Sequence, residues 1–226
     1  MSFQGFIYKG MALIWGEKDA MTTLIIARHG NTFDPGQTPT RVGARTDLPL
    51  TDSGRVQARA IGAWMKHHGI YPHMVYSSEL QRTKETAEIA LKEAGYVEHV
   101  YPLAIFNEIN YGPDENKTEE DVIARIGQQA IKDWDDKAIV PPGWSFDPAV
   151  CIENWANFAG HIVKEDYECV FVVTSNGIAR FAPHLTGDFD GFAENHKIKI
   201  STGALAVLQF DGYLWKVMDW NLKPQC

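Results

Sequence analysis

Two apolar runs, each about the length of one β-strand, constrain the fold of this chain more than any other feature. Residues 24–27 read Leu-Ile-Ile-Ala and residues 170–174 read Val-Phe-Val-Val-Thr, without a charged side chain in either run. Such runs are typical of parallel strands that helices cover on both faces. Each run stops at polar residues and a glycine, and in open α/β sheets ligands bind at those carboxyl ends of the strands. We therefore expect a site where these two strands end.

Helical signals follow the first strand and alternate with a second one. Residues 51–53 (Thr-Asp-Ser) can cap a periodic apolar stretch that ends at Gly69, which predicts an amphipathic helix. Residues 74–76 suit a short strand and residues 80–91 a second helix. This alternation predicts an α/β fold, a three-layer α/β/α sandwich with a mostly parallel central sheet.

The alternation is interrupted over about residues 113–168, which we interpret as a small helical cap inserted into the sandwich. A helix is expected over residues 118–138, a turn-rich loop over residues 141–148 and another helix over residues 152–163. These segments follow one another without an apolar strand between them. We also expect this insertion to contain the residues that determine substrate specificity.

The ends of the chain complete the domain prediction. Residues 204–210 and 213–218 flank an Asp-Gly pair, which predicts a β-hairpin. A length of 226 residues and an apolar content of 45% suit one large domain with a sizeable core. We expect residues 1–21 to be an N-terminal extension and residues 22–226 to form a single domain.

Charge and cysteine content limit the classes of partner. The chain has 29 acidic and 21 basic residues, a formal net charge of -8, which repels nucleic acid and anionic membranes. No stretch approaches the ~20 apolar residues of a membrane-spanning helix. The three cysteines lack metal-ligand spacing and suit a reducing compartment, so a cytoplasmic location is expected. An anionic ligand would have to be attracted by a local cluster of cations.

Four short segments together point to one family. Residues 28–32 read Arg-His-Gly-Asn-Thr, and segments at residues 47–51 (Asp-Leu-Pro-Leu-Thr), 77–82 (Ser-Ser-Glu-Leu-Gln-Arg) and 107–112 (Asn-Glu-Ile-Asn-Tyr-Gly) follow in order. In these segments the chain resembles branch 1 of the histidine phosphatase (phosphoglycerate mutase-like) superfamily, whose signature is Arg-His-Gly-x-Thr. The resemblance covers roughly residues 22–218. It implies phosphoryl transfer through a phosphohistidine.

His29 is the expected nucleophile of such a reaction. A histidine accepts a phosphoryl group only when one ring nitrogen is unprotonated, and the neighbouring Arg28 disfavours the imidazolium form. The guanidinium groups of Arg28 and Arg82 can bind phosphate oxygens and neutralise the transferring group. Asn31 can donate an amide hydrogen bond to the same group. The resemblance implies that both arginines line the phosphate pocket.

Glu108 is the expected general acid and base. It follows an apolar run at residues 103–106, and a carboxyl group in a partly dry pocket is suited to protonate a leaving oxygen. The resemblance implies an acid/base glutamate at this position. Asp114 and Glu115 in the adjoining loop are competing candidates.

The second strand end departs from the family pattern. The family usually has His-Gly-Gly there, and its histidine donates to the transferring phosphoryl group, whereas this chain has Ser175, Asn176 and Gly177. Ser175 and Asn176 can donate hydrogen bonds to phosphate, but neither carries a positive charge. Because losing one preorganised donor costs on the order of 10²- to 10³-fold in rate, we expect weakened catalysis.

Two other phosphate-related motifs do not apply to this chain. No glycine-rich loop followed by a lysine is present to hold a nucleotide phosphate. Residues 188–191 read Asp-Phe-Asp-Gly, which resembles an aspartyl-phosphate motif, but no apolar strand precedes them and we expect a loop. His184 and His196 are further histidines that could approach the site.

The leading hypothesis is hydrolysis of a phosphomonoester, on a small molecule or a protein, through phosphohistidine. The alternative is a non-catalytic pseudophosphatase that binds phosphorylated ligands. A phosphoglycerate mutase is less favoured, because its active-site insertion is normally longer. No cofactor is implied, and we expect no metal requirement because the arginines supply the positive charge that Mg²⁺ supplies elsewhere. The oligomeric state stays open, with a dimer compatible.

Overall fold

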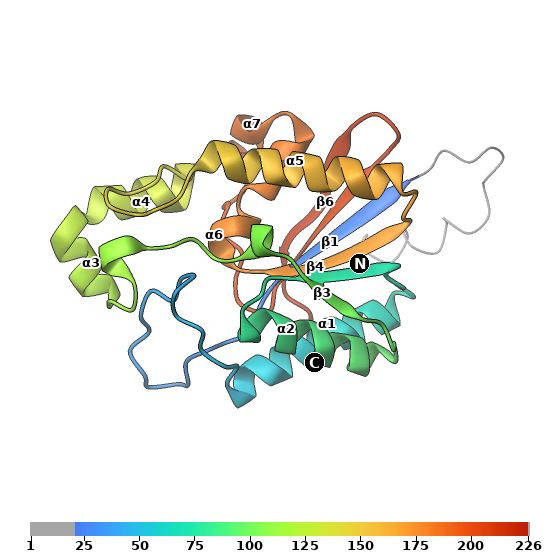
Figure 1. Cartoon of the computed structure of the whole chain (residues 1–226), viewed down its shortest axis with the longest axis horizontal. Coiled ribbons are helices and arrows are strands. Elements are labelled where there is room, and N and C mark those ends of the chain that lie inside the picture. Colours follow the sequence, from blue (N-terminus) through green and yellow to red (C-terminus); the bar gives the residue numbers. More distant parts are fainter. Residues whose placement is uncertain (1–20, 226) are drawn as a thin grey trace, which may run out of the picture.

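The central sheet has six strands in the order β3-β2-β4-β1-β5-β6, in a computed structural model that describes residues 21–225 (Figure 1). The strands are β1 (Thr22–Arg28), β2 (Met74–Ser77), β3 (Val100–Pro102), β4 (Cys169–Thr174), β5 (Leu205–Phe210) and β6 (Trp215–Leu222). β1 pairs in parallel with β4, β4 with β2, and β2 with β3. The hairpin strands β5 and β6 extend the sheet in antiparallel fashion. The mostly parallel sheet and the terminal hairpin are thereby confirmed.

Helices cover both faces of this sheet. Figure 1 shows α1 (Asp52–His67) and α2 (Gln81–Ala94) on one face and α5 (Pro148–Lys164) on the other. Leu24 and Ile26 of β1 pack in the apolar cluster on the α5 side, whereas Ile25 and Ala27 pack in the cluster with α1 and α2. Alternate residues of a strand face opposite sides, so a strand between two helical layers needs apolar residues throughout. The predicted three-layer sandwich is confirmed.

Local signals set the ends of the helices beside the site. The Thr51 hydroxyl accepts a hydrogen bond from the Gly54 N–H at 3.2 Å and caps α1. α2 ends at Gly95, whose φ of 86° is left-handed and suits glycine. The Thr51 N–H also donates to the Asn31 carbonyl at 2.9 Å, which ties the first turn of α1 to the segment that follows β1.

One expectation for the insertion is wrong. The single helix expected over residues 118–138 is two helices, α3 (Glu119–Ile126) and α4 (Gln128–Lys137). They are separated by Gly127, whose φ of 84° is incompatible with a continuous right-handed helix. In Figure 1, α3 and α4 lie beyond the end of the sheet, whereas α5 runs over it. Within residues 113–168, α5 therefore belongs to the sandwich, and the part before it extends past the strand ends.

The segment after β4 contains a second correction. It runs through α6 (Asn176–Ala179), a 3₁₀ turn at Ala182–Thr186, and α7 (Phe189–Asn195). Residues 188–191 were expected to form a loop but begin α7, because the Asp188 carboxylate caps it by accepting the Gly191 N–H at 3.0 Å. This capping role accounts for the Asp-x-x-Gly pattern without phosphoryl chemistry.

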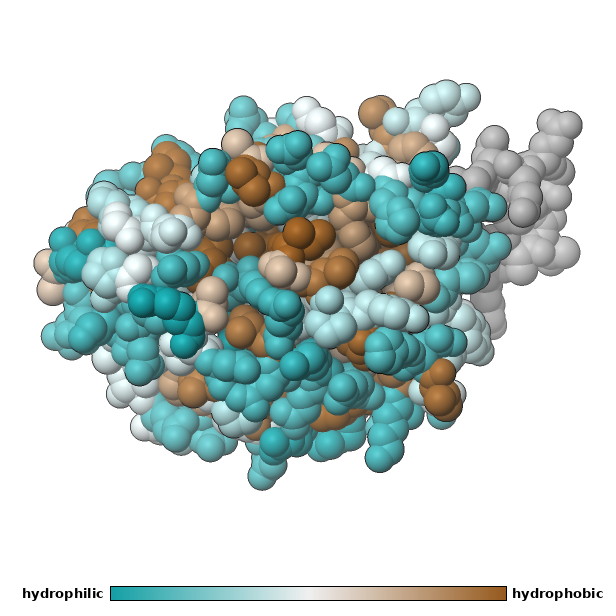
Figure 2. Space-filling model, in the orientation of Figure 1, coloured by the Kyte–Doolittle hydropathy of each residue, from teal (hydrophilic) through white to brown (hydrophobic). Residues whose placement is uncertain are grey.

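The surface is largely hydrophilic on the face drawn in Figure 2, with apolar side chains showing in a band near the middle. Large exposed apolar side chains elsewhere include Tyr213 and Leu214 in the turn between β5 and β6. Within residues 21–225, no helix has the length and apolar character needed to cross a membrane. The expected extension over residues 1–21 lies, apart from Met21, outside the described residues.

Candidate active site

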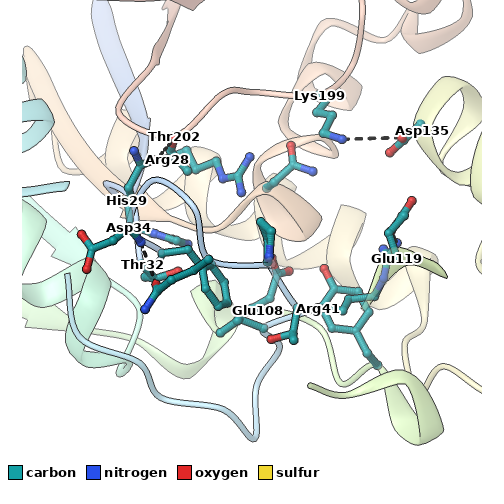
Figure 3. A pocket seen from close by; sticks show the side chains of 18 of the residues that line it. Arg28, His29, Thr32, Asp34, Arg41, Glu108, Glu119, Asp135, Lys199 and Thr202 are labelled. Atoms are coloured by element: carbon teal, nitrogen blue, oxygen red, sulfur yellow. Dashed lines mark hydrogen bonds and ion pairs between the residues drawn. The ribbon is translucent and has the colours of Figure 1, made fainter. Parts of the chain in front are cut away.

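A cavity of about 630 Å³ opens where β1 and β4 end (Figure 3). The strand ends, the loop after β1, the insertion and the segment before β5 all contribute side chains to its wall. Its charged and polar lining residues include Arg28, His29, Asn31, Arg41, Glu108, Glu119, Asp135, Asn176, Arg180, Lys199 and Thr202. The cavity therefore brings together residues that lie far apart in the sequence.

His29 sits at the base of this cavity in a defined tautomer. Its backbone N–H donates to the Thr174 carbonyl at 3.0 Å, which continues the pairing of β1 with β4. Its Nδ1 lies 2.7 Å from the Gly30 carbonyl oxygen, which only accepts, so Nδ1 carries the proton. Nε2 therefore holds a lone pair, and it accepts the Nε–H of Arg82 at 3.2 Å. This unprotonated nitrogen is the candidate nucleophile.

The surroundings keep the His29 ring neutral. Burial, followed by the positive charges of Arg82 and Arg28, lowers the pKa of His29 well below its ordinary value of 6.5. The imidazole therefore stays neutral as the pH falls through 6.5. It gains a proton, and loses its nucleophilic lone pair, only at more acidic pH.

We expect the His29 ring to remain neutral in a titration across pH 6.5, because burial and two cations oppose its protonation. Nitrogen NMR of labelled protein measures this directly, and the His29→Gln variant assigns the resonance. A ring that titrates at or above pH 6.5 would show that the two arginines do not act on it as described.

Arg82 holds a fixed position against His29. It lies in the first turn of α2 and is 0% exposed. Its Nη1 donates to the Thr46 carbonyl at 2.8 Å and its Nη2 to the Gly43 carbonyl at 3.3 Å. Burial lowers the pKa of Arg82, but arginine keeps its charge in proteins. The guanidinium is thus a preorganised cation beside the nucleophile.

Arg28 supplies a second cation at the same point. Its Nη1 donates to the Ile200 carbonyl at 2.8 Å, which anchors one side of the guanidinium. Its buried Nε–H has no acceptor within the described residues. An unpaired charged donor is costly to bury, and an anionic oxygen would satisfy it. Arg28 is therefore poised to bind a phosphoryl oxygen.

Glu108 lines the cavity close enough to Arg28 and Arg82 for its charge to act on both. It is 6% exposed, and its carboxylate accepts the Ile109 N–H at 2.9 Å and the Gly177 N–H at 3.2 Å. Its negative charge raises the pKa of Arg28 against the stronger effect of burial. A side-chain carbon at Gly177 would lie 2.1 Å from Glu108 Oε1. The glycine at the second strand end therefore makes room for this carboxylate.

The two competing carboxylates are engaged elsewhere, and neither lines the cavity. Asp114 is 2% exposed, pairs with Arg125 and accepts the Trp144 indole N–H at 2.7 Å. Glu115 accepts the backbone N–H of Gly43 at 3.0 Å and so holds the loop that contacts Arg82. Both therefore support the site from outside, while Glu108 lies in it.

The two residues in place of the family's histidine and glycine differ in their surroundings. Ser175 is 0% exposed, its hydroxyl has no hydrogen-bond partner within the described residues, and it does not line the cavity. Asn176 does line the cavity, and its Oδ1 accepts the Ile200 N–H at 2.9 Å. This bond orients the amide so that its NH₂ group is turned away from Ile200. Asn176 can therefore donate to a bound anion, although without a charge.

Asn31 also lines the cavity, but its amide is largely occupied. Its Nδ2 donates to the Ser53 hydroxyl at 3.2 Å, and its Oδ1 accepts the Thr202 hydroxyl. One amide N–H is left to contact a ligand. His184 and His196, considered from sequence, do not line this cavity.

Sequence reasoning missed the segment before β5 and two arginines that line the cavity, Arg41 and Arg180. The Ile200 backbone holds both Arg28 and Asn176, and Lys199 reaches the cavity from the same segment. Arg180 donates from Nε to the Asn176 carbonyl at 3.3 Å, one helical turn earlier. The position of Arg180 one helical turn after Asn176 could have identified it as a site residue. The contacts of Ile200 could not have been predicted in this way, because they are made by its backbone and not by its side chain.

The thiol groups and the possible metal ligands of the described residues do not form a reactive centre. Cys151 and Cys169 are buried free thiols, and burial raises the pKa of each to about 12, so neither is a reactive thiolate. Cys226 lies outside the described residues. Across residues 21–225, no group of three or more His, Cys, Asp or Glu side chains is arranged to hold a metal ion.

One family model and several curated relatives match this chain. A model of the histidine phosphatase superfamily (branch 1) matches residues 24–223. A 2,3-bisphosphoglycerate-dependent phosphoglycerate mutase of Clavibacter michiganensis subsp. michiganensis is 32% identical over 124 residues, which cover 53% of this chain and 47% of the relative. The chain thus spans about half the length of such curated relatives.

Solved structures show the same fold at low sequence identity. A mycobacterial glucosyl-3-phosphoglycerate phosphatase has a TM-score of 0.72 and 19% identity, covering 89% of this chain and 99% of its own. A putative alpha-ribazole-5'-P phosphatase of Escherichia coli has a TM-score of 0.68 and 21% identity, covering 89% of this chain and 97% of its own. At this identity the similarity concerns the fold alone.

Proposed function

The chain belongs to branch 1 of the histidine phosphatase superfamily, and from that premise we propose that it hydrolyses phosphomonoesters through a phosphohistidine at His29. The observation that carries this proposal is the neutral, buried imidazole whose Nε2 faces the guanidinium of Arg82. Arg28 and Glu108 face the same cavity. A nucleophile, two cations and a carboxylate are the groups that phosphoryl transfer requires.

In the first step, His29 Nε2 attacks phosphorus and the bond from phosphorus to the ester oxygen breaks. The Arg82 Nε–H, which donates to Nε2 in the structure, shifts to a phosphoryl oxygen, and the unpaired Arg28 Nε–H binds another. Both cations neutralise the charge that develops on the transferring group. Glu108, which two backbone N–H donors hold at the cavity wall, delivers a proton to the leaving oxygen.

In the second step, water replaces the departed alcohol and attacks the phosphohistidine. Glu108, now ionised, accepts the proton of that water, and the phosphorus–nitrogen bond breaks. The electron pair returns to His29 Nε2, whose neutral form burial and the adjacent cations favour. Phosphate then leaves and Glu108 is protonated again for the next cycle.

We propose that turnover is weaker than in relatives that carry a histidine at the second strand end. Asn176 contributes an uncharged donor, and the buried Ser175 hydroxyl does not line the cavity. The same feature supports a second candidate, a non-catalytic binder of phosphorylated ligands. The proposed substrate is a phosphorylated small molecule, the kind of compound that the names of both structural neighbours specify.

The test of this function is a panel of phosphomonoesters assayed with wild type and Glu108→Gln. We expect the substitution to lower kcat/KM for alkyl phosphates by about 10²- to 10³-fold, and much less for p-nitrophenyl phosphate, whose leaving group needs no proton. The exposed Glu98→Gln is the matched control. EDTA should leave the rates unchanged, since the arginines carry the positive charge.

Three results would contradict parts of this scheme. Equal losses of kcat/KM for alkyl phosphates and p-nitrophenyl phosphate would show that Glu108 does not protonate the leaving group. A rate that EDTA abolishes and a divalent ion restores would contradict the metal-free mechanism. Phosphate binding without turnover of any ester would favour the non-catalytic binder.

A further inference from the structure

We propose that the cavity contains a second anion-binding subsite, formed by Arg180 and Lys199, which recognises an anionic group on the leaving part of the substrate. This inference rests on the proposed function, because it concerns the ester that His29 would attack. It assigns a role to two cations that the mechanism above does not use. Both line the same cavity as His29.

Arg180 is a rigidly held guanidinium with an unsatisfied donor. It is 0% exposed, stacks on Trp134 at 3.9 Å from the ring centroid, and donates from Nη1 to the Trp134 carbonyl. Its Nη2 is buried without a hydrogen-bond partner in the described part of the chain. Burial lowers the pKa of Arg180 to about 10, so it stays charged at neutral pH. A buried charged donor without a hydrogen bond fits a position that a ligand oxygen completes.

Asp135 is shared loosely between the two cations. Its carboxylate lies 3.7 Å from Arg180 Nη2 and 3.6 Å from Lys199 Nζ, and both distances exceed hydrogen-bond length. Among these three side chains, one negative charge stands against two positive charges. Lys199 is 55% exposed and can therefore move to meet a ligand. An anion between the two cations would gain direct hydrogen bonds that Asp135 does not make.

The subsite is separate from the phosphoryl position. Figure 3 shows Lys199 and Asp135 on a part of the wall away from His29, so one ligand can reach both with different groups. Two of the aromatic rings that line the cavity already carry a cation over one face, since Arg180 lies over Trp134 and Arg41 over Tyr111. Arg41 is itself paired with Glu119. The wall therefore offers an incoming leaving group the unsatisfied donor of Arg180 and the exposed ammonium of Lys199.

The experiment measures binding of phosphonates, which resist hydrolysis. A series of ω-carboxyalkylphosphonates with lengthening chains is titrated calorimetrically, each beside its carboxamide. We expect the best-fitting acid to bind wild type about tenfold more tightly than its amide, the effect of one charge-assisted contact. Lys199→Met should remove most of this preference and leave the amide affinity unchanged. Lys197→Met, a neighbouring exposed lysine outside the cavity wall, should keep it.

A second pair of variants tests for stronger, not weaker, binding of the carboxylate ligand. Asp135→Asn removes the competing carboxylate and should strengthen binding of the acid, whereas Asp136→Asn, whose carboxylate pairs with the exposed Lys132, should not. A purely structural role of Asp135 would not improve affinity for one ligand class. These variants avoid removing the buried Arg180, whose loss would disturb the packing on Trp134.

The outcomes separate this subsite from the proposed function. Carboxylate preference that depends on Lys199, without turnover of any ester, would support the subsite and overturn the phosphatase assignment. Turnover by wild type with no preference for the acid at any chain length would overturn the subsite alone. Failure of wild type to bind any of the phosphonates would also overturn the subsite.

Discussion

The His29→Gln variant should lose phosphomonoesterase activity by on the order of 10⁴-fold or more in kcat, because removing a nucleophile abolishes the covalent route. Glutamine retains a side chain that can hydrogen bond to the Arg82 guanidinium, so Arg82 keeps a partner in place of Nε2. The measurement is steady-state kcat with p-nitrophenyl phosphate. Trapping of labelled phosphate on the protein, stable to alkali and labile to acid, should occur in wild type and vanish in the variant.

Phosphate binding provides the control for this variant. Arg28 and Arg82 are intact in His29→Gln, so inorganic phosphate should still bind within a few-fold of wild type. His99→Gln changes an exposed histidine that does not line the cavity, and it should alter neither rate nor binding. Equal activity of His29→Gln and wild type would exclude His29 as the nucleophile.

Much of the fold follows from local patterns in this chain. The apolar runs in β1 and β4 predict buried strands because both faces of those strands are covered. The Thr51 cap and the glycine after α2 set helix ends through contacts within a few residues. Patterns of this kind are visible without knowledge of the tertiary structure.

The elements that were predicted wrongly or not predicted depend on features that the hydrophobic pattern of the sequence does not specify. Gly127 continues a helical pattern in the sequence but adopts a φ of 84° and divides it into α3 and α4. Asp188 resembles a loop or catalytic residue but caps α7. β3 is only a short edge strand, Val100–Pro102, and its pairing with β2 is decided by the sheet rather than by its own residues.

The site divides in the same way. Four site residues belong to motifs whose residue types indicate their chemistry, and all four meet at the strand ends: His29, Arg28, Arg82 and Glu108. The supporting contacts cannot be predicted from residue types, because the backbone carbonyl of Ile200 holds Arg28 and its N–H holds Asn176. Lys199 and Arg180 likewise become candidates only when their burial, partners and position at the cavity are known.

The Gly177→Ala variant should lower kcat/KM for alkyl phosphates by about 10²- to 10³-fold, comparable to losing a preorganised catalytic contact. The new methyl carbon would lie 2.1 Å from Glu108 Oε1, and the Gly177 N–H is also one of the carboxylate's two backbone donors. Gly177 lies in α6, and its φ is not positive, so alanine is permitted by the backbone. The effect must therefore arise from displacement of Glu108.

A double variant distinguishes this displacement from a general disturbance. If Gly177→Ala acts through Glu108, adding it to Glu108→Gln should lower the rate little further, because two changes to one interaction are not additive. Gly160→Ala, in α5 with open space around the new carbon, is the matched control and should leave the rate and melting temperature nearly unchanged. Independent, multiplying losses in the double variant would show that Gly177 supports activity by some route other than the placement of Glu108. Full activity in Gly177→Ala would instead mean that the carboxylate does not act from the position seen beside this glycine.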